Sequence, residues 1–131
     1  MRLLLDTHIW LWSRVEPTRL TRRVAEALER PSNELWLSPL SVWELVTLVD
    51  KGRVALDAGV EEWLDLALKK VPVKEAPLTF DVALLTRDIQ LPHRDPVDTL
   101  LAATARAFDL TLVTADARLL QGRGYTTLPN R

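Results

Sequence analysis

Short apolar runs that alternate with helical segments constrain the fold of this chain more than any other feature of its sequence. Residues 2–5, 34–37 and 111–114 form short runs that contain three, two and one Leu, and a helical pattern follows each of them. Runs of this kind predict buried strands of a parallel sheet, because helices cover both faces of such a strand. The fold class expected is α/β, a three-layer α/β/α sandwich with a mainly parallel sheet of about five strands.

The remaining elements are predicted from apolar periodicity and from helix-capping residues. The expected helices are 7–13, 20–30 with Thr18 as its cap, 40–51, 60–70, 77–89, 99–108 and a last turn before the C-terminal strand. The two further strands are expected at 71–73, on a sheet edge, and at 125–128. Repeats, low-complexity segments and linkers are lacking, so we expect a single domain over residues 1–131.

Composition excludes several classes of protein. The chain has no cysteine, which rules out a disulfide framework and a thiolate site, and the cytoplasm is the default compartment. No apolar run approaches the roughly 20 residues of a membrane span, so no membrane association is expected. The formal net charge of −1 lacks the basic excess of a dedicated nucleic-acid binder, although an enzyme that contacts a few nucleotides remains possible.

The segment 93–98 is a well-formed helix start. Asp95 fits the N-cap, Pro96 fits the first helical position and Asp98 falls at the third. Acids in a first turn complement the helix dipole. Capping alone therefore explains both carboxylates when this segment is considered by itself.

Four acids from distant parts of the sequence are nevertheless expected at one edge of the sheet. They are Asp6 after the first run, Glu44 in the helix after the second, Asp98 in the helix before the run 111–114, and Asp116 after that run. Sites in open parallel sheets form where the strands have their carboxyl ends. Each acid also has a structural interpretation, since Asp6 and Asp116 could cap helices and Glu44 could lie on a solvent-exposed face.

Carboxylates brought together repel one another unless some are protonated or a cation lies among them. Oxygen ligands without cysteine favour Mg²⁺ or Mn²⁺, and one or two such ions in a carboxylate cluster are suited to phosphodiester hydrolysis. His8 and His93 lack a partner at metal-ligand spacing, so we interpret them as local hydrogen-bonding residues or substrate contacts.

Four segments together resemble a known family. They are 3–12 (LLLDTHIWLW), 37–45 (LSPLSVWEL), 91–105 (LPHRDPVDTLLAATA) and 110–116 (LTLVTAD). In this order and at these separations they resemble PIN domains, and closely the VapC toxins of type II toxin–antitoxin pairs in the His-Arg-Asp-Pro subfamily. The usual subfamily pattern has an aromatic residue at Val97 and an arginine at Thr99, so a salt bridge from that arginine is not expected here.

The resemblance implies a five-stranded parallel α/β/α sandwich and an Mg²⁺- or Mn²⁺-dependent ribonuclease. It implies a homodimer that a VapB-type antitoxin neutralises, with DNA contacted only through the antitoxin. The family's four acids fall on Asp6, Glu44, Asp98 and Asp116, as catalytic residues and metal ligands, and Asp95 is a candidate fifth ligand.

The resulting hypothesis is an endoribonuclease. In this hypothesis, Thr7, Ser41 and Thr114 form hydrogen bonds that position the acids, and Arg94 contacts the scissile phosphate. One alternative is a phosphatase with Asp6 as covalent nucleophile, which usually needs a second Asp where His8 stands. Another is a binding module of a toxin–antitoxin repressor complex with weak or no nuclease activity.

The sequence also predicts a partner surface. The helix 40–49 is almost wholly apolar, and Trp10 and Trp12 lie close together in the chain. Together they provide more apolar surface than one small sheet can cover. We expect an antitoxin or a second copy of the chain to cover part of it.

Overall fold

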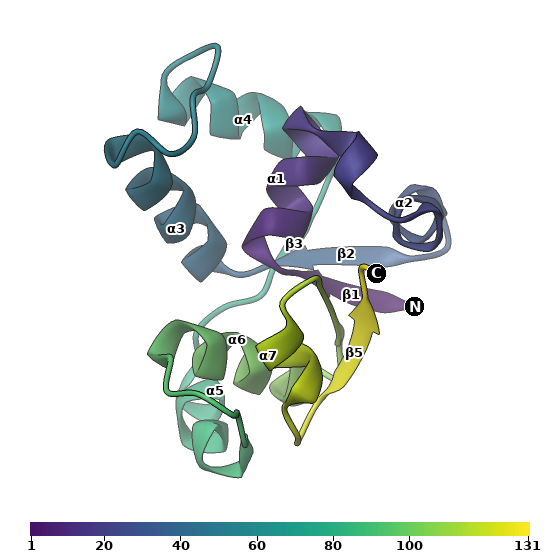
Figure 1. Ribbon diagram of the computed structural model, residues 1–131, viewed down its shortest axis with the longest axis vertical. Coiled ribbons are helices and arrows are strands. Elements are labelled where there is room, and N and C mark those ends of the chain that lie inside the picture. Colours follow the sequence, from purple (N-terminus) through teal and green to yellow (C-terminus); the bar gives the residue numbers. More distant parts are fainter.

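A five-stranded, wholly parallel sheet lies at the centre of the computed structural model, which describes residues Met1–Arg131 (Figure 1). The strand order is β3-β2-β1-β4-β5. The strands are β1 (Arg2–Leu5), β2 (Glu34–Leu37), β3 (Lys74–Glu75), β4 (Thr111–Thr114) and β5 (Thr126–Pro129). The parallel pairing of every neighbouring pair confirms the predicted sheet.

Helices cover both faces of this sheet, with α1, α2, α3 and α4 on one side of it and α5, α6 and α7 on the other (Figure 1). Their bounds are α1 (Thr7–Val15), α2 (Arg22–Glu29), α3 (Pro39–Asp50), α4 (Val60–Lys70), α5 (Phe80–Leu85), α6 (Pro96–Ala107) and α7 (Ala117–Gln121). Two 3₁₀ turns, Pro17–Arg19 and Thr86–Asp88, complete the chain. None of the helices is both long enough and apolar enough to cross a membrane.

Strand β1 explains why the core has two halves. Leu3 and Leu5 belong to an apolar cluster that includes residues of α1, α3 and α4, whereas Leu4 belongs to a cluster with Leu101 of α6 and Leu119 of α7. Successive side chains of a strand point to opposite faces, so a run of three buried leucines requires cover on both. Because β1 is the middle strand, the residue that follows it, Asp6, lies at the centre of the sheet's carboxyl edge.

Two predicted boundaries were wrong. Thr21, not Thr18, caps α2, because the Thr21 hydroxyl accepts the Val24 N–H at 3.2 Å while Thr18 lies inside a 3₁₀ turn. The edge strand is Lys74–Glu75 instead of 71–73. Pro72 has no N–H to donate to a ladder, and pairing with β2 begins only beyond Val73.

The predicted helix 77–89 is shorter than expected. Thr79 caps α5 by accepting the Val82 N–H at 3.2 Å, which leaves Pro77 outside the helix, and the Thr86–Asp88 turn follows Leu85. Trp10 also differs from expectation, because its side chain is 3% exposed and packs edge-on against Trp63 at 5.6 Å between ring centroids. Trp10 is therefore a core residue.

Candidate active site

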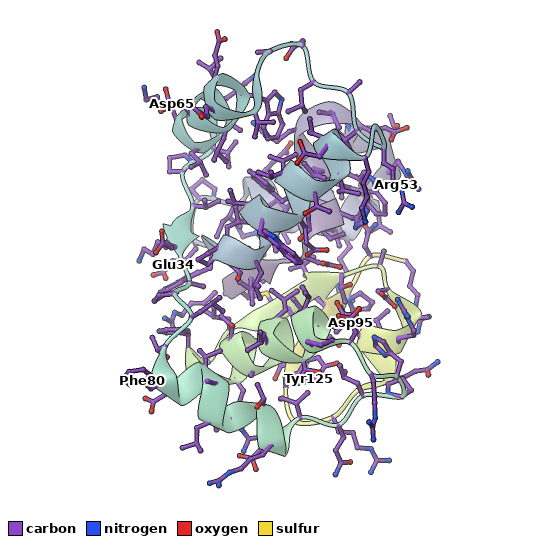
Figure 2. The ribbon with its side chains drawn as sticks, turned by 90° about the vertical axis from the view of Figure 1, so that its left-hand side faces the viewer. Glu34, Arg53, Asp65, Phe80, Asp95 and Tyr125 are labelled. Carbon is purple, nitrogen blue, oxygen red and sulfur yellow. The ribbon has the colours of Figure 1, made fainter.

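A cavity of about 340 Å³ lies where β1 and β4 end. The residues that line it are Asp6, His8, Trp12, Glu44, Asp95, Asp98, Ala115, Asp116 and Arg118. In Figure 2, Asp95 marks the N-terminal end of α6, in the region between α3 above it and the C-terminal elements. The structure thus brings all four predicted acids, together with Asp95, to the wall of one cavity.

Asp6 follows β1 directly and caps α1. Its Oδ1 accepts the Thr7 N–H at 2.8 Å and its Oδ2 accepts the Thr114 hydroxyl at 2.7 Å. Its backbone N–H donates to the carbonyl of Val113, which extends the pairing of β1 with β4 by one residue. Burial raises the pKa of Asp6 to about 6 in spite of these hydrogen bonds. The carboxylate is fixed in position, and its charge is poorly solvated.

Glu44 is held by a short chain of hydroxyl groups. The Thr7 hydroxyl lies 2.7 Å from Oε1 of Glu44 and 2.9 Å from Oγ of Ser41. Because Thr7 has one hydroxyl hydrogen, it can donate to the carboxylate only if it accepts from Ser41. Thr7 and Ser41 are fully buried, so this chain joins α1 to α3 and points Glu44 at the cavity.

Asp95 and Asp98 both lie at the start of α6, as predicted. Asp95 is the N-cap, since its Oδ1 accepts the backbone N–H groups of Val97 and Asp98 at 3.0 and 3.1 Å. Burial raises the pKa of Asp98 above its usual range, against the hydrogen bond from His93. The carboxylates of Asp95 and Asp116 add to that rise through their charge.

His93 lies beside two of the acids, a position that the sequence did not predict. Its Nε2 lies 2.9 Å from Oδ2 of Asp98, and ligand atoms of His93, Asp95 and Asp98 all lie within 4.8 Å of one another. A neutral imidazole that donates from Nε2 leaves Nδ1 as an acceptor, and Nδ1 is buried without a partner. The interpretation of His93 as a local hydrogen-bonding residue is confirmed, but its proximity to two acids was missed. The i+2 and i+5 spacing to those acids was the available signal.

Asp116 differs from the other acids because a cation lies against it. Its Oδ1 caps α7 by accepting the Arg118 N–H at 2.8 Å, and its Oδ2 lies 3.3 Å from Nη2 of Arg118. Burial raises the pKa of Asp116, but the hydrogen bonds from Arg118 outweigh burial and hold the pKa below its usual range. The sequence did not single out Arg118, whereas Arg94, the residue it favoured, is exposed and lines a neighbouring hollow with His93 and Asp95.

The donor set fits a hard divalent cation. Five carboxylates line the cavity, and burial raises the pKa of two of them, Asp6 and Asp98. Burial destabilises the ionised form of these carboxyl groups unless a cation lies nearby. Oxygen-rich sites without thiolates suit Mg²⁺ or Mn²⁺. Asp6, Glu44, Asp98 and Asp116 reach the cavity from four different elements, so their carboxylates are candidate ligands for such an ion.

The enclosed Asp6 carboxyl makes a prediction about stability. Its pKa moves from 3.8 to about 6 on folding, so the metal-free protein loses stability as pH rises through that interval. We expect Asp6→Asn to be more stable than the wild type by about 2–3 kcal/mol at pH 7 in EDTA, and to show a flatter pH profile. Urea unfolding followed by tryptophan fluorescence between pH 4 and 8 measures this.

The matched control for this experiment is Asp57→Asn, because Asp57 is exposed. That variant should follow the wild-type profile. If Asp6→Asn is no more stable than the wild type at pH 7 in EDTA, the Asp6 carboxylate is not destabilised by burial and the prediction is wrong.

Comparisons with known proteins agree with this geometry. A family model described as PIN domain matches residues 3–124. Ribonuclease VapC22 of Mycobacterium tuberculosis is 34% identical over 124 residues, which cover 92% of this chain and 92% of that protein.

Solved structures share the fold. A chain in the VapBC2 complex of Rickettsia felis, bound to a DNA fragment from its promoter, superposes with a TM-score of 0.76 at 18% identity and covers 98% of both chains. A chain in VapBC-1 of nontypeable Haemophilus influenzae gives 0.64 at 16% identity, again over 98% of both. With a family model that spans nearly the whole sequence and a relative of 34% identity, the chain belongs to the PIN-domain family.

Proposed function

We propose that this protein is a metal-dependent endoribonuclease and the toxin of a toxin–antitoxin pair. The observation that supports this most directly is the convergence of Asp6, Glu44, Asp98 and Asp116 on one cavity. Membership of the PIN-domain family and likeness to a relative named ribonuclease VapC22 support the same proposal. The cavity lining has no serine or cysteine that could act as a nucleophile.

In this mechanism the four acids would hold Mg²⁺ or Mn²⁺. When bound, the ion would supply Lewis acidity that activates water and stabilises charge on the leaving oxygen. Water adds in line to phosphorus, the bond to O3′ breaks, and the products carry a 5′-phosphate and a 3′-hydroxyl. The protein's contribution is positional, because Thr114 orients Asp6 while Thr7 and Ser41 orient Glu44.

The covalent phosphatase is less well supported. Oδ1 and Oδ2 of Asp6 each accept a hydrogen bond, from Thr7 and Thr114, which lowers the nucleophilicity of both oxygens. His8 occupies the position where a second acid is usual, and its side chain is exposed. The binding-module alternative is not favoured either, since it leaves a complete set of four acids without a role.

Cleavage of total cellular RNA tests the nuclease proposal. The purified wild type should cut at a few loop sites with Mg²⁺ or Mn²⁺ and not in EDTA. Asp98→Asn should lower the rate by about a hundredfold or more, because it removes a proposed metal ligand. Asp57→Asn should cut like the wild type, and sequencing of the ends would identify the target. An active Asp98→Asn protein would refute the site assignment, and an inactive wild type would favour the binding module.

We also propose that the antitoxin docks in an apolar groove beside α1 and α2. A hollow of about 340 Å³ is lined by eight hydrophobic residues, among them Leu20, Leu28 and Val73. Arg14 and Lys70 line it too, and Nε of Arg14 is buried without a partner. An unpaired buried donor is costly, so a partner segment that is apolar and carries a carboxylate would relieve it.

A VapB-type antitoxin is the partner to test in this groove. Arg14→Gln should weaken that complex about tenfold by calorimetry, because it removes one charge-assisted hydrogen bond. Arg87→Gln, a change at an exposed 3₁₀-turn residue, should leave the affinity unchanged. Equal affinities for the two variants would place the antitoxin elsewhere.

A homodimer is the remaining part of the proposal. α3 and α5 are both visible in Figure 2, and Phe80 lies at the left-hand margin of that view, at the start of α5. Phe80 is 96% exposed, and Trp43, Val46 and Leu84 on the same two helices are also exposed. Large apolar side chains that are exposed to solvent are candidates for a contact surface.

Sedimentation velocity tests the dimer. At micromolar concentration the wild type should sediment as a dimer, and Phe80→Asp should raise the dissociation constant at least about tenfold by placing a charge in the contact. Leu66→Asp, at an exposed position of α4, serves as the control and should remain dimeric. A wild type that is strictly monomeric would rule the dimer out.

A further inference from the structure

Arg118 is the one arginine or lysine among the residues that line the acidic cavity. Its side chain is 57% exposed, and its guanidinium contacts Asp116 through Nη2 to Oδ2 at 3.3 Å and Nε to Oδ1 at 3.4 Å. Charge-assisted hydrogen bonds between such groups are usually about 2.7–2.9 Å long. The guanidinium is therefore held loosely at the rim of the cavity.

Asp116 does not need this guanidinium to keep its place. Its Oδ1 accepts the Arg118 backbone N–H at 2.8 Å, and its own N–H donates to the Thr114 hydroxyl at 3.0 Å. These two bonds fix the carboxylate through the backbone of the β4–α7 turn. The guanidinium of Arg118 can therefore leave Asp116 and bind another group without displacing that carboxylate.

A phosphodiester that enters this cavity meets five carboxylates, which repel it. The guanidinium of Arg118 is the positive group already present at the entrance, and its planar fork matches two phosphate oxygens. Arg94, by contrast, lines a separate hollow beyond Asp95. The geometry thus favours Arg118 as the residue that receives the phosphate.

We propose that Arg118 is a substrate-binding residue whose guanidinium exchanges Asp116 for a non-bridging oxygen of an RNA phosphate. The same exchange frees Asp116 for a divalent cation, so guanidinium and cation compete for one carboxylate. This inference rests on the proposed function for the identity of the substrate. Its alternative is that Arg118 is only a clamp that positions Asp116.

The two roles give opposite results for metal binding. If Arg118 competes with the cation, Arg118→Gln binds Mn²⁺ about two- to fivefold more tightly than the wild type, since a neighbouring positive charge is gone. If Arg118 is a clamp, the same variant binds Mn²⁺ more weakly or unchanged. Titration calorimetry with MnCl₂ and no RNA separates these outcomes without any measurement of activity.

RNA binding gives the second measurement. The probe is a fluorescein-labelled single-stranded RNA of 20 random nucleotides, followed by anisotropy in EDTA and, in parallel, in CaCl₂, over a range of KCl concentrations. Arg118→Gln should bind about tenfold more weakly, because it loses a charge-assisted hydrogen bond. Its salt dependence should also fall by about 0.7 in slope, the value for one phosphate contact on a single strand.

Arg118→Lys and Arg87→Gln complete the set. The lysine variant keeps the charge and loses the fork, so it should retain the wild-type salt slope and recover only part of the affinity. Arg87→Gln removes an arginine from the exposed turn Thr86–Asp88 and should match the wild type.

The inference is overturned if Arg118→Gln binds RNA as Arg87→Gln does, if the wild type binds the probe in neither buffer, or if Arg118→Gln fails to bind Mn²⁺ more tightly. It stands if both shifts occur even when the wild type cleaves no RNA. In that case the nuclease proposal fails by itself, and the phosphate contact remains.

Discussion

The repulsion among five carboxylates in one small cavity is the constraint on which the rest of this structure depends. Three of the five are held by hydroxyl and backbone N–H groups. Thr7 N–H and the Thr114 hydroxyl hold Asp6, a hydroxyl holds Glu44, and backbone N–H groups hold Asp95. Neutral donors fix the geometry of a carboxylate and leave its negative charge uncompensated. The uncompensated negative charge of such a site favours the binding of a cation.

The order of the strands explains why these residues meet. In the order β3-β2-β1-β4-β5, the chain leaves β1 toward one edge for β2 and returns to the other side of β1 for β4. Ligand sites of open parallel sheets lie at such a reversal, beyond the carboxyl ends of the strands. Asp6 follows one central strand and Asp116 follows the other, so the topology alone places two of the acids side by side. The helices that start at Ser38 and Asp95 then bring Glu44 and Asp98 to the same place.

Sequence patterns predicted this framework well because it depends on local rules. The leucine run of β1, the caps at Asp6, Asp95 and Asp116, and parallel pairing together imply the acidic edge of the sheet. The contacts that long side chains make in space could not be predicted in the same way. The bond from His93 to Asp98 and the position of Arg118 depend on rotamers and on loop paths, which periodicity does not determine. The edge strand was misplaced for a similar reason, since Pro72 disrupts a ladder that hydrophobicity alone favours.

Helix capping does not exclude the catalytic role proposed for these acids. Asp6, Asp95 and Asp116 each accept the backbone N–H groups that a helix start leaves unpaired, and each also lines the cavity. Each carboxylate oxygen has two lone pairs, so an oxygen that accepts a hydrogen bond can still bind a ligand. Thr99 reinforces this helix start, because its hydroxyl donates to the carbonyl of Asp95 at 2.8 Å. Helix capping therefore holds these acids in place at the sheet edge, where the proposed chemistry requires them.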